Sequence, residues 1–274
     1  MNTDSQSNGT LRYIRARWPT YLIGFAGGAL GALLLIILAV EVGAWSLVFL
    51  GLIVLLILAY FFTTSLWAAN EQFNRRHTQP SHVIFELGHI QPTDDLVYVG
   101  LGLRDTPIQL SRRLTRGHVR AIDVYNPQLA PGRALARQRR PTPLGQPDPR
   151  LTWLDGNIDL LPLPDHSAPV AATSFTLFEF WQHGDRKLLL SEMYRILQPG
   201  GQLLMAEPAR TRTQLMLIGP AALRLPPPDY WRQLVRDVGF RIAREENIGD
   251  FYLCFRAEKP LPGEIQQLAL DLGV

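Results

Sequence analysis

The sequence predicts an α/β domain with a parallel sheet, preceded by two apolar helices. Residues 94–127 read as a strand, a glycine turn, a helix and a second strand that ends in an acid, an arrangement typical of half a nucleotide-binding unit. Two long apolar runs fill most of the chain before residue 68. The rest of the 274-residue chain is long enough for one α/β domain of ordinary size.

The glycine turn follows residues 96–99, a short apolar run of β-prone residues, and contains Gly100 and Gly102. Two closely spaced glycines let backbone N–H groups approach a ligand and leave the next helix N-terminus aimed at it. The following strand, residues 119–122, brings Asp123 to its carboxyl end, where a carboxylate accepts hydrogen bonds from both hydroxyls of a ribose. A separation of about 20 residues from turn to acid fits this role. A tight turn without a ligand and an acid that caps a helix are the alternatives.

A second motif lies downstream, where residues 195–207 form a helix that is stopped by Pro-Gly-Gly and turned directly into a buried strand. With Leu-Pro-Leu-Pro-Asp at residues 161–165, the order and spacing resemble those of class I S-adenosylmethionine-dependent methyltransferases, in the type 11 branch that includes the ubiquinone and menaquinone C-methyltransferases. The resemblance covers residues 83–260. It implies a Rossmann-like, seven-stranded sheet with helices on both faces, and S-adenosyl-L-methionine as the cofactor.

The chain departs from this family at several positions. Tyr98 stands where the first strand usually carries an acid, and Arg104 stands where a third glycine is usual. The family's acid near the adenine amine aligns with Asn157, and Asp155 lies two residues earlier. The resemblance therefore implies that Asn157 and Asp155 join the glycine turn and the ribose acid in binding the cofactor.

Methyl transfer from a sulfonium is an in-line displacement, so the protein mainly orients the reactants and excludes water. A base is needed only where an oxygen or nitrogen acceptor must lose a proton, and no catalytic residue is assigned. Four candidates near strand ends each have an alternative as a cap, a loop residue or core: Glu179, His183, Glu207 and Tyr230. Nearby aromatic residues either line an acceptor pocket or pack in the core: Phe175, Phe178, Phe180 and Trp181.

The apolar runs span residues 21–40 and 44–67, with a break at Glu41-Val42-Gly43. Each is long enough to cross the ~30 Å hydrocarbon layer as a helix, which predicts a transmembrane hairpin. A signal peptide is the alternative, but the first run is too long and no clear cleavage site follows it. Arginines on both flanks place both chain ends in the cytoplasm: Arg12, Arg15, Arg17, Arg75 and Arg76. We therefore expect a multi-pass protein of the inner membrane with its large domain in the cytoplasm.

Small residues in the first run would let helices pack closely. These residues are Gly24, Gly28 and Ala32, with Gly27 and Gly31 alongside. They serve either the hairpin itself or a homodimer formed through it.

The composition indicates few other partners. The net charge is +3 and nearly all basic residues are Arg, without an RNA-binding aromatic motif, so no nucleic-acid partner is expected. The arginines between residues 112 and 150 are interpreted as solvated helix faces, with contact to anionic lipid as the alternative. Cys254 is the only cysteine and the six histidines lack ligand spacing, so neither an internal disulfide nor a bound metal is expected.

The expected organisation has five parts: a cytoplasmic tail (1–19), the hairpin (20–67), a juxtamembrane linker (68–82), the methyltransferase-like domain (83–260) and a C-terminal tail (261–274). Within the domain, further helices are expected at 128–140, 185–197 and 228–238, and further strands at 151–154, 170–174 and 202–206. Strands at 240–246 and 251–257 are expected to form a closing hairpin across Gly249 and Asp250.

Three functions are compatible with these features. The first is a membrane-tethered methyltransferase whose acceptor is a lipophilic molecule drawn from the membrane. The second is a non-catalytic relative that binds a partner, which the departures at Tyr98 and Arg104 favour. The third is a nicotinamide-dependent oxidoreductase, against which the missing third glycine and the closing hairpin both count.

Overall fold

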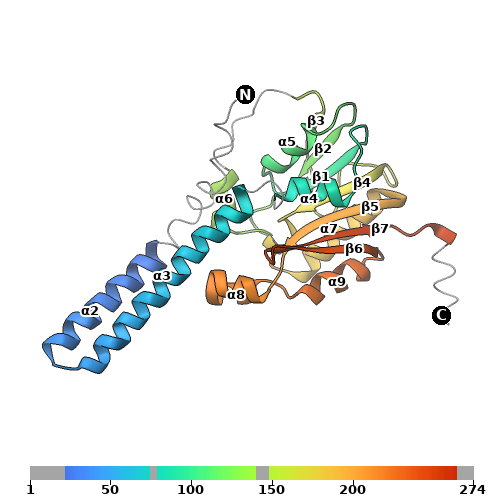
Figure 1. Cartoon of the computed structure of the whole chain (residues 1–274). Coiled ribbons are helices and arrows are strands. Elements are labelled where there is room, and N and C mark those ends of the chain that lie inside the picture. Colours follow the sequence, from blue (N-terminus) through green and yellow to red (C-terminus); the bar gives the residue numbers. More distant parts are fainter. Residues whose placement is uncertain (1–21, 75–78, 140–147, 264–274) are drawn as a thin grey trace, which may run out of the picture.

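The computed structural model describes residues 22–74, 79–139 and 148–263. One sheet is covered by helices on both faces, and two long helices project from this domain as a hairpin (Figure 1). The α/β class and the leading pair of helices are therefore as predicted.

The sheet has the strand order β3-β2-β1-β4-β5-β7-β6. Its strands are β1 (Leu96–Gly100), β2 (Val119–Asp123), β3 (Leu151–Asp155), β4 (Ala168–Ser174), β5 (Leu197–Pro208), β6 (Arg241–Ile248) and β7 (Tyr252–Glu258). Strands β1 to β5 are parallel, and β7 runs antiparallel to both β5 and β6. This antiparallel pair is the predicted closing hairpin, and it counts against the oxidoreductase alternative.

The helices fall into a domain set and a hairpin set. They are η2 (Leu22–Ala26), α2 (Gly27–Glu41), α3 (Trp45–Asn74), α4 (Pro80–Leu87), α5 (Asp105–Ser111), α6 (Arg133–Arg139), η4 (Leu177–Glu179), α7 (His183–Ile196), α8 (Arg212–Ile218), η5 (Gly219–Arg224) and α9 (Pro228–Asp237). Helices α6, α7 and α9 contribute to the core on one face of the sheet, and α4 and α5 contribute to the core on the other.

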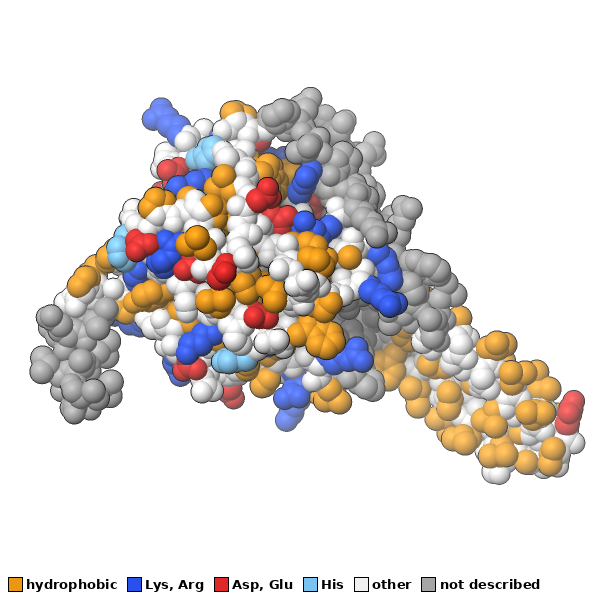
Figure 2. Space-filling view, turned by 180° about the vertical axis from the view of Figure 1, so that it is seen from behind, with side chains coloured by type: hydrophobic (Ala, Val, Ile, Leu, Met, Phe, Trp, Pro, Cys, Tyr) orange, Lys and Arg blue, Asp and Glu red, His pale blue; other side chains and the backbone are white. Residues whose placement is uncertain are grey.

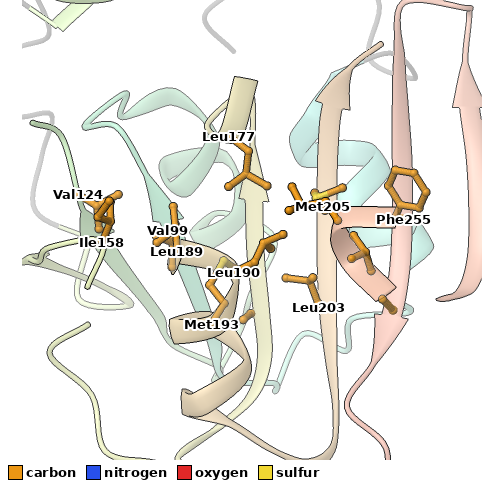
Figure 3. Close-up of a cluster of buried hydrophobic side chains, with 14 of the residues drawn as sticks. Val99, Val124, Ile158, Leu177, Leu189, Leu190, Met193, Leu203, Met205 and Phe255 are labelled. Atoms are coloured by element: carbon orange, nitrogen blue, oxygen red, sulfur yellow. The ribbon is translucent and has the colours of Figure 1, made fainter. Parts of the chain in front are cut away.

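The central strands are apolar throughout because both of their faces are covered. Successive side chains of a strand point to opposite faces, so Val97 and Val99 of β1 enter one core while Leu96 and Tyr98 enter the other. Figure 3 shows the first of these cores, where side chains of α7 such as Leu190 pack against the sheet. The strand ends, rather than the strand faces, are therefore left to form a site.

The hairpin contains two segments long and apolar enough to cross a membrane, Gly24–Glu41 in η2 and α2, and Trp45–Thr64 in α3. Only 11% and 6% of the residues in these segments are buried. Leu30, Phe49 and Leu56 are 61%, 65% and 70% exposed, and the projecting hairpin is covered with hydrophobic side chains (Figure 2). Core helices of a soluble protein bury such residues, so these two segments are candidate membrane spans by length, composition and exposure.

The small residues of α2 contribute unequally to the hairpin. A Cβ on Gly28 would lie 3.1 Å from a methyl group of Leu58 in α3, and Ala32 is buried. Among the described residues, a Cβ on the remaining three would meet nothing within 4 Å: Gly24, Gly27 and Gly31. Gly28 thus serves helix packing within the hairpin, and the homodimer stays a prediction.

Two helices begin where the sequence did not suggest. The side-chain oxygen of Asn126 accepts the Gln128 N–H at 2.9 Å. The backbone carbonyl of Asn126 accepts the N–H groups of Leu129 and Ala130. This turn, followed by Pro131, delays α6 to Arg133. Helix α4 begins at Pro80, inside the expected juxtamembrane linker, where the missing N–H of proline is harmless.

Helix α8 and η5 were not expected at all. The hydroxyl of Thr211 accepts the Gln214 N–H at 3.1 Å. Thr211 is therefore the N-cap of α8, and Gln214, three positions later, is its partner. That spacing was a readable signal. The flanking arginines expected to set the topology, and the tail from residue 264 onward, lie outside the described residues.

Candidate active site

The predicted site residues meet at the carboxyl edge of the sheet. Gly100 pairs with Asp123 across β1 and β2, and Asp123 pairs with Asp155 across β2 and β3. Neighbouring strands lie about 4.8 Å apart, so these three positions form one row. The Gly156 N–H donates to the Asp123 carbonyl at 3.0 Å, which starts the loop that carries Asn157 at this edge.

Gly102 faces the Asp123 carboxylate across the glycine turn. Its φ of +72° is in the left-handed region, which favours glycine. A Cβ on Gly102 would collide with the Asp123 carboxylate and with the guanidinium of Arg139. The turn and the acid therefore form a cradle that any other side chain would fill, which fits a ribose held between them.

Gly100 packs against the side chain of Tyr98, and its predicted contact with the cofactor stays a prediction. A Cβ there would lie 2.8 Å from Cε1 of Tyr98, the residue that replaces the usual acid. The Tyr98 hydroxyl lies 2.8 Å from Ser174 Oγ at the end of β4, and burial raises the pKa of Tyr98 to about 12. Gly100 thus makes room for a neutral tyrosine that ties β1 to β4. Arg104 lies over the ring of Trp153, 5.7 Å from its centre.

Sequence reasoning missed Arg139, which engages the predicted ribose acid. Its Nη1 and Nη2 donate to the two oxygens of Asp123 at 2.9 and 2.8 Å, and Nη1 also donates to the Leu101 carbonyl. The guanidinium lies 4.0 Å from the ring centre of Tyr125. Interpreting the arginines of this region as solvated or lipid-facing was therefore wrong for Arg139.

Asn157 and Asp155 are both exposed at the strand edge. The Asn157 side-chain oxygen accepts the Ile158 N–H at 2.8 Å, so its amide is oriented by its own loop. Their assignment to the cofactor stays a prediction.

Glu207 is not a catalytic candidate, because it is fully buried and holds the loop after β4. Its carboxylate accepts N–H groups from Thr176 and Leu177 at 2.9 Å and from Phe178 at 3.2 Å. Burial raises the pKa of Glu207 to about 7, although these hydrogen bonds oppose the shift. The prediction that Glu207 could act as a base was wrong, because its buried carboxyl group cannot reach a methyl acceptor.

Two other base candidates are in contact with each other. His183 Nδ1 lies 3.0 Å from the Tyr230 hydroxyl, and Arg186 donates to that hydroxyl at 2.9 Å. His183 begins α7 and Tyr230 lies in the first turn of α9, so the carboxyl edge holds both. Glu179 lies elsewhere on this edge: a Cβ on Gly132 would be 2.8 Å from Glu179 Oε2.

The aromatic segment divides between core and surface. Phe180 is fully buried, which assigns it to the core, and Trp181 is 78% exposed. Phe175 has a φ of +49°, a strained conformation for a bulky residue, and its ring contacts those of Phe178 and Tyr252 edge to face. Such strain is commonest where function requires a fixed geometry.

The strand order reverses between β1 and β4, and ligands of open α/β sheets bind at such a switch point. The glycine turn at this point, the acid after β2 and the antiparallel β7 give the domain the fold of class I S-adenosylmethionine-dependent methyltransferases. Residues 97–205 match the Methyltransf_11 family, described as a methyltransferase domain. The predicted resemblance and the cofactor it implies, S-adenosylmethionine, are thereby confirmed.

Two curated relatives share this domain. Residues of this chain are 28% identical over 117 residues to the ubiquinone/menaquinone biosynthesis C-methyltransferase UbiE of Ruegeria sp. (strain TM1040), covering 43% of each chain. They are 30% identical over 112 residues to UbiE of Dinoroseobacter shibae, covering 41% of each chain. The chain thus spans less than half the length of the curated relatives it matches.

Solved structures support the fold. A SAM-dependent methyltransferase from Aquifex aeolicus matches with a TM-score of 0.51 and 21% identity, over 66% of this chain and 89% of that one. A chain from a complex that contains the Haloferax volcanii Trm112 methyltransferase activator matches with a TM-score of 0.51 and 16% identity, over 74% of this chain and 96% of that one.

Proposed function

We propose that this protein is a membrane-anchored methyltransferase that transfers the methyl group of S-adenosylmethionine to a lipophilic acceptor. The observation that carries the proposal is the position of α8. This helix follows the carboxyl end of β5 and contacts α3 of the hairpin (Figure 1). The edge of the sheet that holds the candidate site is therefore on the hairpin side of the domain.

A site on that side suits a substrate that stays in the bilayer. A short tether keeps the site within a few nanometres of the membrane, where a lipid is concentrated. The aromatic side chains Phe175, Phe178 and Trp181 offer apolar surface at the same edge. Both curated relatives are named as C-methyltransferases of quinone biosynthesis, which favours a quinone precursor or another isoprenoid lipid.

In this proposal the residues of the edge bind and orient rather than react. When bound, S-adenosylmethionine would supply a methyl group on a sulfonium, and the neutral thioether, S-adenosylhomocysteine, would be the leaving group. Gly102 and Asp123 hold the ribose side of the cofactor, and the aromatic residues exclude water. The contact between His183 and Tyr230 provides a path for a proton where the acceptor must lose one.

The acceptor can be tested directly. The purified full-length protein is incubated with methyl-labelled S-adenosylmethionine and its own membranes, and the mixture is extracted with organic solvent. We expect label in the organic phase. Label that stays with protein or in the aqueous phase, while turnover is evident, would exclude a lipid acceptor. The hairpin would then serve only to localise the enzyme.

The anchor makes a separate prediction about topology. Reporter fusions after Gly9 and after Val274 should both report the cytoplasm, because both ends of a two-span hairpin lie on one side. A fusion after Gly43, between the spans, should report the opposite face. An external signal from the C-terminal fusion would contradict the hairpin.

A second candidate is a non-catalytic, partner-binding domain. It is favoured by the ion pair between Arg139 and Asp123, which engages the acid that a cofactor needs. Calorimetric titration with S-adenosylmethionine separates the two candidates, because only the methyltransferase is expected to bind it.

A further inference from the structure

We infer that Arg139 competes with the cofactor's ribose for the Asp123 carboxylate and thereby sets the affinity of this domain for S-adenosylmethionine. The inference rests on the proposed function, since it takes Asp123 as the ribose acid. Arg139 would then be a residue outside the glycine turn that sets the affinity for the cofactor.

The competition follows from the atoms involved. A ribose bound through its two hydroxyls needs the carboxylate oxygens, and Arg139 donates to both at 2.9 and 2.8 Å. The guanidinium also lies where a Cβ on Gly102 would be, between the turn and the acid. Ribose and guanidinium therefore cannot hold the same space and the same oxygens together.

Several contacts keep Arg139 in this position. The side chains of Arg139 and Asp123 are only 25% and 22% exposed, so their two-point pair is less screened than a surface ion pair. The Leu101 carbonyl accepts a further hydrogen bond from Nη1. Stacking on Tyr125 adds a cation–π contact, and the Tyr125 N–H donates to Asp123 Oδ1 at 3.0 Å. When the cofactor binds, hydrogen bonds from the ribose hydroxyls must replace those that Arg139 donates to the Asp123 carboxylate.

Two measurable consequences follow. The apparent affinity for the cofactor is the intrinsic affinity multiplied by the fraction of molecules in which Asp123 is not paired with Arg139. If the ion pair is formed in nine of ten molecules, binding is therefore weakened about tenfold. Salt screens the attraction between the two charges, over a Debye length of about 10 Å at 0.1 M. Cofactor affinity should therefore rise with salt as long as Arg139 is present.

The test compares matched variants of the full-length protein in detergent, titrated calorimetrically with S-adenosylmethionine and S-adenosylhomocysteine. Arg139→Met should bind about tenfold more tightly than the wild type and lose the rise of affinity with salt. Arg133→Met is the control, because Arg133 is an exposed residue of the same helix and its loss removes the same charge. It should bind like the wild type.

A second pair of variants tests the mechanism. Asp123→Asn removes the charge that holds Arg139, so adding Arg139→Met to it should change affinity by less than about twofold. Arg139→Gln, which keeps a polar side chain, should shift affinity in the same direction as Arg139→Met and guards against a folding artefact of the methionine.

The outcomes separate the two levels of the argument. If the wild type binds and Arg139→Met binds equally or more weakly, competition is excluded while the proposed function stands; weaker binding would make Arg139 a cofactor ligand. If no variant binds either compound, the proposed function falls and the inference falls with it.

Discussion

Gly102→Ala should reduce the affinity for S-adenosylmethionine at least a hundredfold. A methyl group there would enter the space between the glycine turn and the Asp123 carboxylate, where it collides with the carboxylate itself. The other neighbour, the guanidinium of Arg139, is the end of a flexible side chain and can move away. The carboxylate yields less easily, because the Tyr125 N–H holds it. Calorimetric titration measures the loss, which at a hundredfold corresponds to about 2.7 kcal/mol.

The matched control is Gly200→Ala. Gly200 has a φ of +76°, close to the +72° of Gly102, so both substitutions carry a similar backbone penalty of about 1 kcal/mol. Gly200 lies in the Pro-Gly-Gly joint. Among the described residues, a Cβ there would meet just a methyl group of Leu261, at 3.4 Å. We expect unchanged cofactor binding there. Equal losses in the two variants would mean that strain, and not the cradle, explains the Gly102 effect.

Glu207→Ala should lower the free energy of unfolding by about 4 kcal/mol, because it leaves the buried N–H groups of residues 176–178 without an acceptor. In a domain of this size that corresponds to a melting temperature roughly 10 °C lower. Glu246→Ala is the control. Glu246 pairs with Arg244 at the surface, so its loss should change stability by less than about 0.5 kcal/mol. A Glu207→Ala variant as stable as this control would contradict the structural role.

The same carboxyl group makes a prediction about pH. Its pKa is about 7 in the folded protein and 4.5 as an ordinary glutamate, so the folded state binds the proton more tightly. This contribution is complete below pH 4.5 and is lost as pH rises through about 7, by up to about 3 kcal/mol. Glu207→Gln cannot titrate. The stability difference between wild type and Glu207→Gln should therefore shift in favour of the variant from pH 5 to pH 7.5, and a constant difference would refute the raised pKa.

Local sequence patterns were sufficient for the architecture. Uninterrupted apolar runs predicted both hairpin helices and the central strands. The central strands show such runs because both of their faces are buried. The glycine turn, the acid after β2 and the Pro-Gly-Gly joint carried the resemblance that implied a seven-stranded methyltransferase sheet. Asp123 and Asp155 met at one edge because parallel strands end on the same side.

Some short-range signals were present but not used. The pair Thr211 and Gln214 has the spacing of a helix start, yet α8 was missed. This omission mattered, since the contact of α8 with α3 of the hairpin is the observation that carries the proposed function.

Only the tertiary structure decided what the site residues touch. Glu207 accepts three N–H groups from the loop after the neighbouring strand β4, and Asp123 pairs with Arg139 of a later helix. None of these partners has a fixed spacing in the sequence. A carboxylate after a strand looks the same in sequence whether it faces a ribose, a guanidinium or a ring of backbone donors, because the difference lies in which distant segment the fold packs against it.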